Sequence, residues 1–330
     1  MDSDSTAMDN PIKNLAFGPV PSRRLGQSLG INNIPPKICT YSCVYCQVGR
    51  TLNMQSERMA FYKPEDVFQA VKEKIRESRG KNEPIDYLTF VPDGEPTLDQ
   101  NLGVDIERLK STGISVAVIT NSSLIGRKDV RDDLKKADWV SVKIDAVSQG
   151  AWHKVNRPHG SLNLDRILNG ILEFASSYKG ELSTETMLIQ NFNDDPDEIE
   201  LISEFIGKFM PYKSYIAIPT RPPAEKYVEV PPENIVNRAY QIFNERMIPT
   251  EYLIGYEGNA FAFTGNIEED LLSITSVHPM RQDAVHKLLE KAKVGWSVVK
   301  DLIEREKLIE VEYKKRKFYV RKLNHPPSSL

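Results

Sequence analysis

Cys39-Thr40-Tyr41-Ser42-Cys43-Val44-Tyr45-Cys46 contains all three cysteines of the 330-residue chain, with the spacing CxxxCxxC. Three thiols this close together are typical of metal ligands, because buried cysteines that only fill a core have no reason to share one loop. An odd number cannot form a closed set of disulfides, and no fourth cysteine exists to complete an all-thiolate site. The stretch therefore predicts a metal centre with one coordination position left open.

Two kinds of metal site fit these three thiols. A structural zinc ion would take its fourth ligand from a distant histidine, and the chain offers His153, His159, His278, His286 and His325. A [4Fe-4S] cluster held by three thiolates would instead leave one iron open to a small molecule. No histidine lies inside the motif, so we favour the iron–sulfur cluster.

The stretch resembles the signature of the radical S-adenosylmethionine (radical SAM) superfamily, CxxxCx(aromatic)C, with Tyr45 at the aromatic position. The resemblance implies that Cys39, Cys43 and Cys46 hold a [4Fe-4S] cluster whose open iron binds S-adenosyl-L-methionine (SAM). It also implies that the reduced cluster cleaves SAM to a 5′-deoxyadenosyl radical, which removes a hydrogen atom from the substrate. A reduced electron donor of the flavodoxin or ferredoxin type is then an expected partner.

The composition is that of an ordinary folded protein, with 40% hydrophobic and 27% charged residues. No apolar run approaches the roughly 20 residues that span a bilayer, and residues 1–6 lack the basic and apolar character of a signal peptide. We therefore expect a cytoplasmic protein that does not associate with membranes. The net charge of −3 argues against a globally basic nucleic-acid binder but allows a local basic patch.

The hydrophobic period alternates between strand and helix over most of the chain. Strands are predicted at 29–34, 87–91, 115–119, 139–144, 183–189 and 215–218, and helices from Pro64 and at 102–111, 128–136, 164–178, 196–209 and 232–246. Six strand–helix units predict an α/β fold with a parallel sheet and right-handed crossovers. The repeat matches the partial (β/α)6 TIM-type barrel of the radical SAM family.

Polar residues follow the predicted strands, at the edge where parallel α/β folds place their active sites. Pro92-Asp93-Gly94-Glu95-Pro96 resembles the family's Gly-Gly-Glu motif, which holds the amino group of SAM, although Asp93 replaces the first glycine. The alternative is a Pro-Gly turn with an exposed glutamate. The predicted cofactor contacts are Tyr45, Gly94, Glu95, Asn121, Ser122, Lys143, Asp145 and Met187. Helix capping, solvent exposure or core packing would explain several of these residues equally well.

Four arginines are predicted to contact the substrate. Arg23 and Arg24 lie in a turn-rich segment just before the cysteines, while Arg157 and Arg221 lie in rigid turns after the fourth and sixth predicted strands. Arginines at the mouth of a barrel suit an anionic or phosphate-bearing substrate. The alternative is that they only stabilise surface loops through ion pairs.

A change of pattern near Gly265 predicts a second domain. Helical stripes over 285–292 and 298–303 precede strands at 308–313 and 318–321, which resembles a winged helix-turn-helix. We therefore divide the chain into a mobile leader (1–16), the barrel (17–264), a winged-helix-like domain (265–325) and a tail (326–330).

The predicted hairpin tip, Lys314-Lys315-Arg316-Lys317, is the most basic part of the chain. Residues 287–322 contain twelve Lys or Arg against six acids. Such a tip would attract a phosphate backbone, although docking of a protein or peptide, or plain solvation, explains it as well. Acidic Asp301, Glu304 and Glu306 on the second helix argue against reading of a DNA major groove.

Residues 17–263 resemble the wyosine-synthase-like subgroup of the superfamily, whose members modify a guanosine next to a tRNA anticodon. Those synthases carry a second set of cysteines for another cluster, which this chain lacks. We therefore predict a radical SAM enzyme with one cluster, and we favour modification of RNA, most of all tRNA. The alternatives are radical modification of a docked protein or peptide, and an iron–sulfur or zinc-containing regulator that binds DNA.

Overall fold

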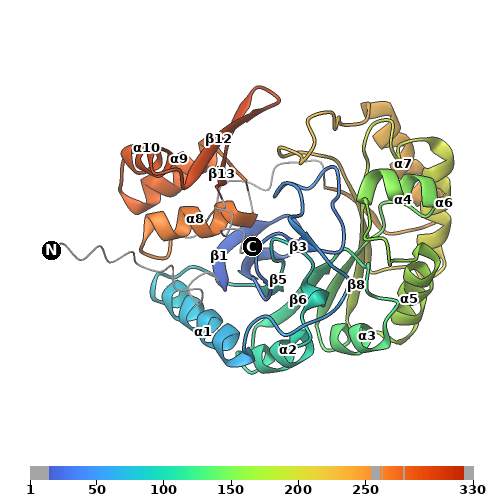
Figure 1. The fold of residues 1–330 in the computed structure, drawn as a ribbon, viewed down its shortest axis with the longest axis horizontal. Coiled ribbons are helices and arrows are strands. Elements are labelled where there is room, and N and C mark those ends of the chain that lie inside the picture. The colour runs from blue at the N-terminus through green and yellow to red at the C-terminus, as the bar shows by residue number, and fades with distance from the viewer. Residues whose placement is uncertain (1–14, 254–260, 262, 278, 323–330) are drawn as a thin grey trace, which may run out of the picture.

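A curled sheet of eight strands forms the centre of the computed structural model, which describes residues 15–253, 261, 263–277 and 279–322. From β2 to β10 the strands are parallel, and only β1 runs antiparallel to its neighbour. The order across the sheet is β1 (Ala16–Ser22), β2 (Gly26–Ile31), β5 (Tyr87–Phe90), β6 (Ser115–Thr120), β7 (Trp139–Lys143), β8 (Glu181–Met187), β9 (Lys213–Ala217) and β10 (Thr250–Leu253). The sheet is thus an open half-barrel (Figure 1).

Helices cover the outer face of this half-barrel (Figure 1). They are α1 (Pro64–Gly80), α2 (Leu102–Lys110), α3 (Lys128–Leu134), α5 (Leu164–Ser177), α6 (Pro196–Gly207) and α7 (Glu233–Glu245). The short helix α4 (Gln149–Asn156) lies instead against residues 42–44. In α1, Pro64 occupies a first-turn position that needs no N–H, and Val67, Val71 and Ile75 are buried along one face. The same periodicity allowed this helix to be predicted.

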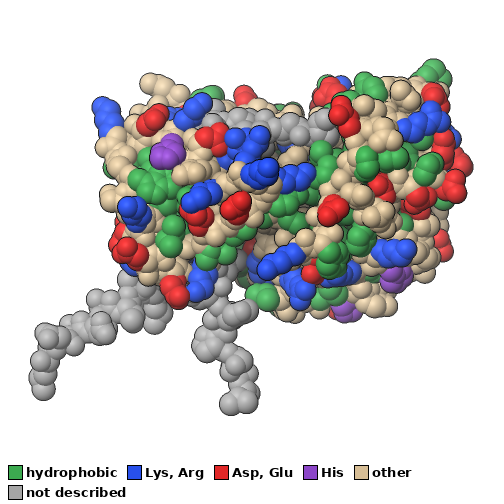
Figure 2. Space-filling model, turned by 90° about the horizontal axis from the view of Figure 1, so that it is seen from above, with side chains coloured by type: hydrophobic (Ala, Val, Ile, Leu, Met, Phe, Trp, Pro, Cys, Tyr) green, Lys and Arg blue, Asp and Glu red, His purple; other side chains and the backbone are tan. Residues whose placement is uncertain are grey.

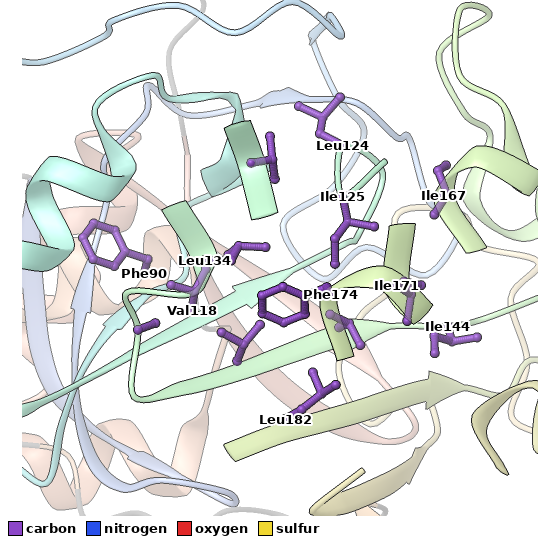
Figure 3. Packing of buried hydrophobic residues seen from close by; sticks show 14 of the residues in the cluster. Phe90, Val118, Leu124, Ile125, Leu134, Ile144, Ile167, Ile171, Phe174 and Leu182 are labelled. Atoms are coloured by element: carbon purple, nitrogen blue, oxygen red, sulfur yellow. The ribbon is translucent and has the colours of Figure 1, made fainter. Parts of the chain in front are cut away.

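The main core fills the space between the sheet and these helices (Figure 3). Phe90 and Val118 project from adjacent strands, and Phe174 and Ile171 approach from α5. All four side chains are essentially fully buried. A parallel sheet covered in this way is rich in apolar residues along its strands, which explains why most strands were recognisable.

The amino end of the half-barrel is closed by the turn between β1 and β2. Leu25, in this turn, is 3% exposed and belongs to a buried cluster with Trp139, Tyr215 and Leu253 from the barrel interior. The guanidinium of Arg24 lies 5.9 Å from the ring centroid of Trp139 and 6.0 Å from that of Tyr215. We call these residues the barrel floor.

The six predicted strands are present as β2 and β5 to β9, with shifted ends, and each predicted barrel helix is present. The prediction of six strands was nevertheless short of the eight observed, because β1 and β10 were missed. Helix α4 was missed as well. Pro19 and Pro21 made β1 look like a turn, but an edge strand tolerates proline because one side of its backbone needs no partner.

A C-terminal module follows the barrel and comprises α8 (Ile267–Val277), β11 (Met280–Arg281), α9 (Gln282–Ala292), α10 (Ser297–Glu304), β12 (Leu308–Tyr313) and β13 (Arg316–Arg321). Its three strands form a sheet with the order β11-β13-β12. The sequence predicted α9, α10 and the hairpin, but neither α8 nor β11. Leu271 and Ile274 of α8 share a buried cluster with Phe17 and Val20 of β1.

Parts of the predicted domain scheme lie outside the described residues, namely residues 1–14 of the leader, residues 323–325 at the end of the second domain, and the tail. Within the described part of the chain, no helix has both the length and the apolar character to cross a membrane.

Candidate active site

The three cysteines line one cavity of about 260 Å³ at the carboxyl edge of the sheet. They belong to the cysteine loop (residues 32–54), which follows β2 and contains the short strands β3 (Ile38–Cys39) and β4 (Asn53–Met54). The ends of β5, β6, β7 and β8 also contribute to the lining. The cavity therefore lies where parallel α/β folds gather their functional residues.

Backbone hydrogen bonds fix the course of the cysteine loop on both sides. Val44 N–H donates to the carbonyl of Val155 at 3.0 Å, and Ser42 N–H donates to that of Asn156 at 3.1 Å. Both acceptors belong to the last turn of α4. On the other side, Glu95 N–H donates to the carbonyl of Ile38 at 3.3 Å.

The thiols lie in surroundings that disfavour their ionised form. Burial raises the pKa of Cys43 to about 12, and the nearby Asp145 carboxylate adds to this effect. Burial also raises the pKa of Cys39 and of Cys46. Nδ2 of Asn156 lies 3.5 Å from the sulfur of Cys43. This contact lowers the pKa of Cys43 by less than burial raises it. A bound cation would be the group that holds these sulfurs as thiolates.

Three thiols that line one cavity are the donor set of a [4Fe-4S] cluster with one open iron. Among the residues that the structure describes, no three His, Cys, Asp or Glu side chains gather closely enough to share one metal ion. A [4Fe-4S] cluster takes one thiolate per iron, so its cysteines lie further apart than the ligands of one zinc ion. The donor set of three thiols around one cavity fits a cluster with one open iron.

Gly94 brings two loops into close contact. A Cβ atom at this position would lie 2.0 Å from the carbonyl oxygen of Ile38 and 2.7 Å from Cδ1 of Ile34. Only glycine therefore lets the loop after β5 approach the cysteine loop at this point.

The Glu95 side chain is buried and accepts four hydrogen bonds. Oε1 accepts from Thr97 N–H at 3.1 Å and from the hydroxyls of Thr97 and Thr120 at 2.6 Å each. Oε2 accepts from Asn121 N–H at 2.7 Å. The exposed glutamate of the alternative interpretation is not what the structure shows, because Glu95 is only 1% exposed and lines the cavity.

Asn121 and Ser122, both predicted to contact the cofactor, have different positions in the structure. Asn121 lines the cavity, and its Nδ2 donates to the Thr40 hydroxyl at 2.8 Å and lies 3.5 Å from the sulfur of Cys39. Ser122 is buried outside the lining, at a backbone φ of 69°, and its N–H donates to the Thr120 hydroxyl at 3.0 Å. The structure therefore brings Asn121 to the cysteines and places Ser122 in the turn behind it.

A row of charges, of which Glu185 is buried and Lys143 and Arg24 are partly buried, crosses the barrel interior near the cysteines. Lys143 Nζ lies 2.8 Å from Oε1 of Glu185 and 4.7 Å from the ring centroid of Tyr45. Arg24 donates to the other oxygen of Glu185. Burial alone would lower the pKa of Lys143, but the Glu185 and Asp145 charges outweigh it and raise that pKa. These carboxylates therefore favour the charged form of Lys143, which lines the cavity.

Asp145 uses both carboxylate oxygens within the protein. Oδ1 accepts from Met187 N–H at 2.9 Å, while Oδ2 accepts from Asn156 Nδ2 at 2.8 Å and from the Tyr45 hydroxyl. Asp145 is not among the residues that line the cavity, whereas Tyr45 and Met187 are. Its place in the structure is to orient Tyr45 and Asn156 from behind.

The four arginines predicted from sequence fall into two groups. Arg23, Arg24 and Arg221 line the cavity. Arg23 also donates to the carbonyl of Leu253, and Arg221 donates to Oε1 of Gln47. Arg157 lies elsewhere, with its guanidinium 2.6 Å from Oε1 of Glu225. The structure therefore brings three of the four to the cavity.

Sequence reasoning missed the pair formed by Lys37 and Asp93, which face each other across the cavity lining at 3.6 Å between Nζ and Oδ2. Burial raises the pKa of Asp93 to about 6, although the Lys37 charge lowers it in part. The available signal was the charge at Asp93, which replaces a glycine of the family motif and needs a cation nearby.

Residues 33–203 match the model of the radical SAM superfamily, and the chain belongs to this superfamily. It is 49% identical over 311 residues to a UPF0026 protein of Methanocaldococcus jannaschii, a match that covers 94% of this chain and 96% of that protein. A UPF0026 protein of Helicobacter pylori strain 26695 is 36% identical over 204 residues, which cover 61% of this chain and 64% of the relative.

Solved structures agree in fold. A radical SAM methyltransferase from Sphaerobacter thermophilus aligns with a TM-score of 0.53 at 15% identity, over 69% of this chain and 66% of that enzyme. At such low identity the likeness concerns the fold alone. Enzymes of this superfamily use a [4Fe-4S] cluster and SAM, so the protein is a radical SAM enzyme.

Proposed function

We propose that Cys39, Cys43 and Cys46 bind one [4Fe-4S] cluster and that the cavity beside them binds SAM at its open iron. When bound, the cluster and SAM supply reductive cleavage of a C–S bond and a carbon radical that removes hydrogen from the substrate. The observation that carries this proposal is the convergence of all three thiols on one cavity with the partly buried Lys143 and the buried Glu95. A reduced flavodoxin or ferredoxin would supply the electron.

The protein residues would bind and orient SAM. Lys143, kept charged by Glu185, is suited to the carboxylate of SAM. Oε2 of Glu95 accepts one bond against three for Oε1, so it is the oxygen suited to the amino group. Tyr45 and Met187 supply apolar surface that keeps water out of the cavity.

The first test is chemical. Protein reconstituted with iron and sulfide should contain about four iron atoms per chain and should release methionine and 5′-deoxyadenosine only when a reductant is present. The products can be measured by chromatography. Iron without release of either product would contradict the proposed reaction, and zinc in place of iron would contradict the proposed cluster.

We propose further that the substrate is an RNA, most of all a tRNA, and that the C-terminal module is a winged helix that holds its backbone. Lys314, Lys315 and Arg316 are exposed, and none of them makes an ion pair with a residue that the structure describes. By contrast, Lys317 is paired with Glu310 at 2.8 Å. Three uncompensated cations at one tip suit phosphates.

The hairpin tip lies beside the mouth of the barrel. The Tyr313 hydroxyl donates to the carbonyl of Pro219 at 3.2 Å, which ties the hairpin to the loop that carries Arg221. Figure 2 shows Lys and Arg side chains gathered in the middle of this face, where the module meets the barrel. A phosphate backbone held there would present a base to the cavity.

The second test is binding of tRNA. Lys314→Glu with Lys315→Glu should weaken tRNA binding by about tenfold or more and flatten its salt dependence, because two phosphate contacts are lost. Lys72→Glu with Arg79→Glu, on exposed positions of α1, is the matched control and should change little. Equal binding by both variants would contradict the role of the tip.

The same assay tests the alternatives. Preference for duplex DNA over tRNA would support a DNA-binding regulator, and no binding of either nucleic acid would favour a protein or peptide substrate.

A further inference from the structure

The segment 219–231, which links β9 to α7, lies across the cysteine loop and is called the strap. Arg221 donates to Gln47, and Glu225 N–H donates to the carbonyl of Val44 at 3.1 Å. Val228 is buried together with Val44, Val155 and Ile189. The strap therefore contacts the cysteine loop through side chain, backbone and apolar packing.

Glu225 forms the polar centre of the strap. Its Oε1 accepts from Nε of Arg50 at 2.9 Å and from Nη1 of Arg157 at 2.6 Å, and its Oε2 accepts from Nη2 of Arg50 at 2.8 Å. The Glu225 side chain is only 6% exposed, whereas that of Arg50 is 69% exposed. The guanidinium of Arg50 binds both oxygens of Glu225, and such a bidentate pair fixes the orientation of the two groups relative to each other.

The two arginines belong to two different segments that hold the cysteines in place, the cysteine loop and the end of α4. Arg50 lies four residues after Cys46, in the exit of the cysteine loop. Arg157 is the left-handed residue that ends α4, directly after the turn that receives the N–H of Val44. Between Cys43 and Cys46, Val44 is thus fixed by α4 through its N–H and by the strap through its carbonyl.

We propose that Glu225 is a positioning residue for the iron–sulfur cluster. By joining Arg50 to Arg157, it holds the Cys43–Cys46 segment against α4 and so fixes where two of the three sulfurs lie. Groups that orient metal ligands without touching the metal commonly change metal retention by 10- to 100-fold when they are altered. The inference rests on the proposal that the cysteines bind the cluster.

The test is retention of iron. In reconstituted protein without SAM, Glu225→Gln should lose iron to a chelator about tenfold faster than the wild type, because the amide carries no charge and its NH2 group cannot accept the bond that Oε2 takes from Arg50. Glu200→Gln is the control, since it breaks an ion pair of 2.7 Å between Glu200 of α6 and Arg246, which directly follows α7. The control should release iron at the wild-type rate.

Two further readouts separate positioning from general stability. The electron paramagnetic resonance spectrum of the reduced cluster should change in Glu225→Gln and return toward the wild-type spectrum in Glu225→Asp, which restores the negative charge. If Glu225→Gln does not fold, Arg157→Gln removes one half of the link and should show a smaller acceleration of iron loss.

The outcomes distinguish this inference from the proposed function. Wild-type protein that binds no iron would overturn both. Wild-type protein that holds its cluster, together with a Glu225→Gln variant that matches the control in iron release and in spectrum, would overturn only the role of Glu225.

Discussion

Gly94 shows how a single missing side chain can determine a site. The backbone at this position touches the cysteine loop so closely that a Cβ atom would lie 2.0 Å from the Ile38 carbonyl. Cys39 follows directly in the chain, so a displaced Ile38 moves a predicted cluster ligand. The glycine thus contributes through the space it leaves, in addition to any contact of its backbone with SAM.

We expect Gly94→Ala to lower the iron content of reconstituted protein by half or more, because the loops must separate by about 1 Å or more to admit the methyl group. Gly150→Ala is the control, since no heavy atom lies within 4 Å of the added Cβ there. Iron analysis together with thermal unfolding measures the effect. A Gly94→Ala variant with full iron content would contradict this account of the contact.

At the same scale, individual site residues differed in how far sequence could predict them. Lys143 and Glu95 could be found because Lys143 ends, and Glu95 follows, a strand that the hydrophobic period makes evident. The link from Glu225 to Arg50 and Arg157 could not, because it joins residues 175 and 68 positions apart in sequence. Nothing in the local pattern around Glu225 differs from that of an ordinary surface loop.

At the scale of elements, the repeated strand–helix units could be predicted from the sequence, whereas the elements outside this repeat were missed. The α/β half-barrel follows from regular alternation of period, and the barrel helices predicted from it are present. β1 was missed because its prolines are typical of turns, and only its place at the edge of the sheet makes them acceptable. α4 was missed although α3, with 7 residues, was predicted, because the buried face of α4 includes the small Ala151 and the polar Asn156 and so lacks a clear apolar stripe.

The strap and α4 together explain why the cysteine loop needs little regular structure of its own. Its two short strands, β3 and β4, have two residues each. Some of its backbone N–H groups donate to neighbouring elements, including Ser42 to Asn156 and Val44 to Val155. Loops of this kind are ordered by their surroundings, which a sequence does not display locally.

At the scale of the whole molecule, the barrel and the C-terminal module share a core. Phe17 and Val20 of β1 are buried with Leu271, Ile274 and Met280 of the module. Lys291 of α9 adds an ion pair to Glu83, beyond the end of α1. The module is therefore held in a fixed position relative to the barrel mouth, as the proposed role of its hairpin in binding RNA requires.

The barrel floor has a kinetic consequence. Leu25 and Arg24 fill the amino end of the half-barrel, so that end is closed to SAM, and the cavity lies at the opposite, carboxyl edge, where a substrate would dock. A large substrate that docks over this edge would slow the dissociation of SAM, so bound SAM would react more often than it leaves. We expect tRNA to slow the dissociation of SAM several-fold, which filtration of labelled SAM can measure. Unchanged dissociation in the presence of bound tRNA would show that SAM has another way out.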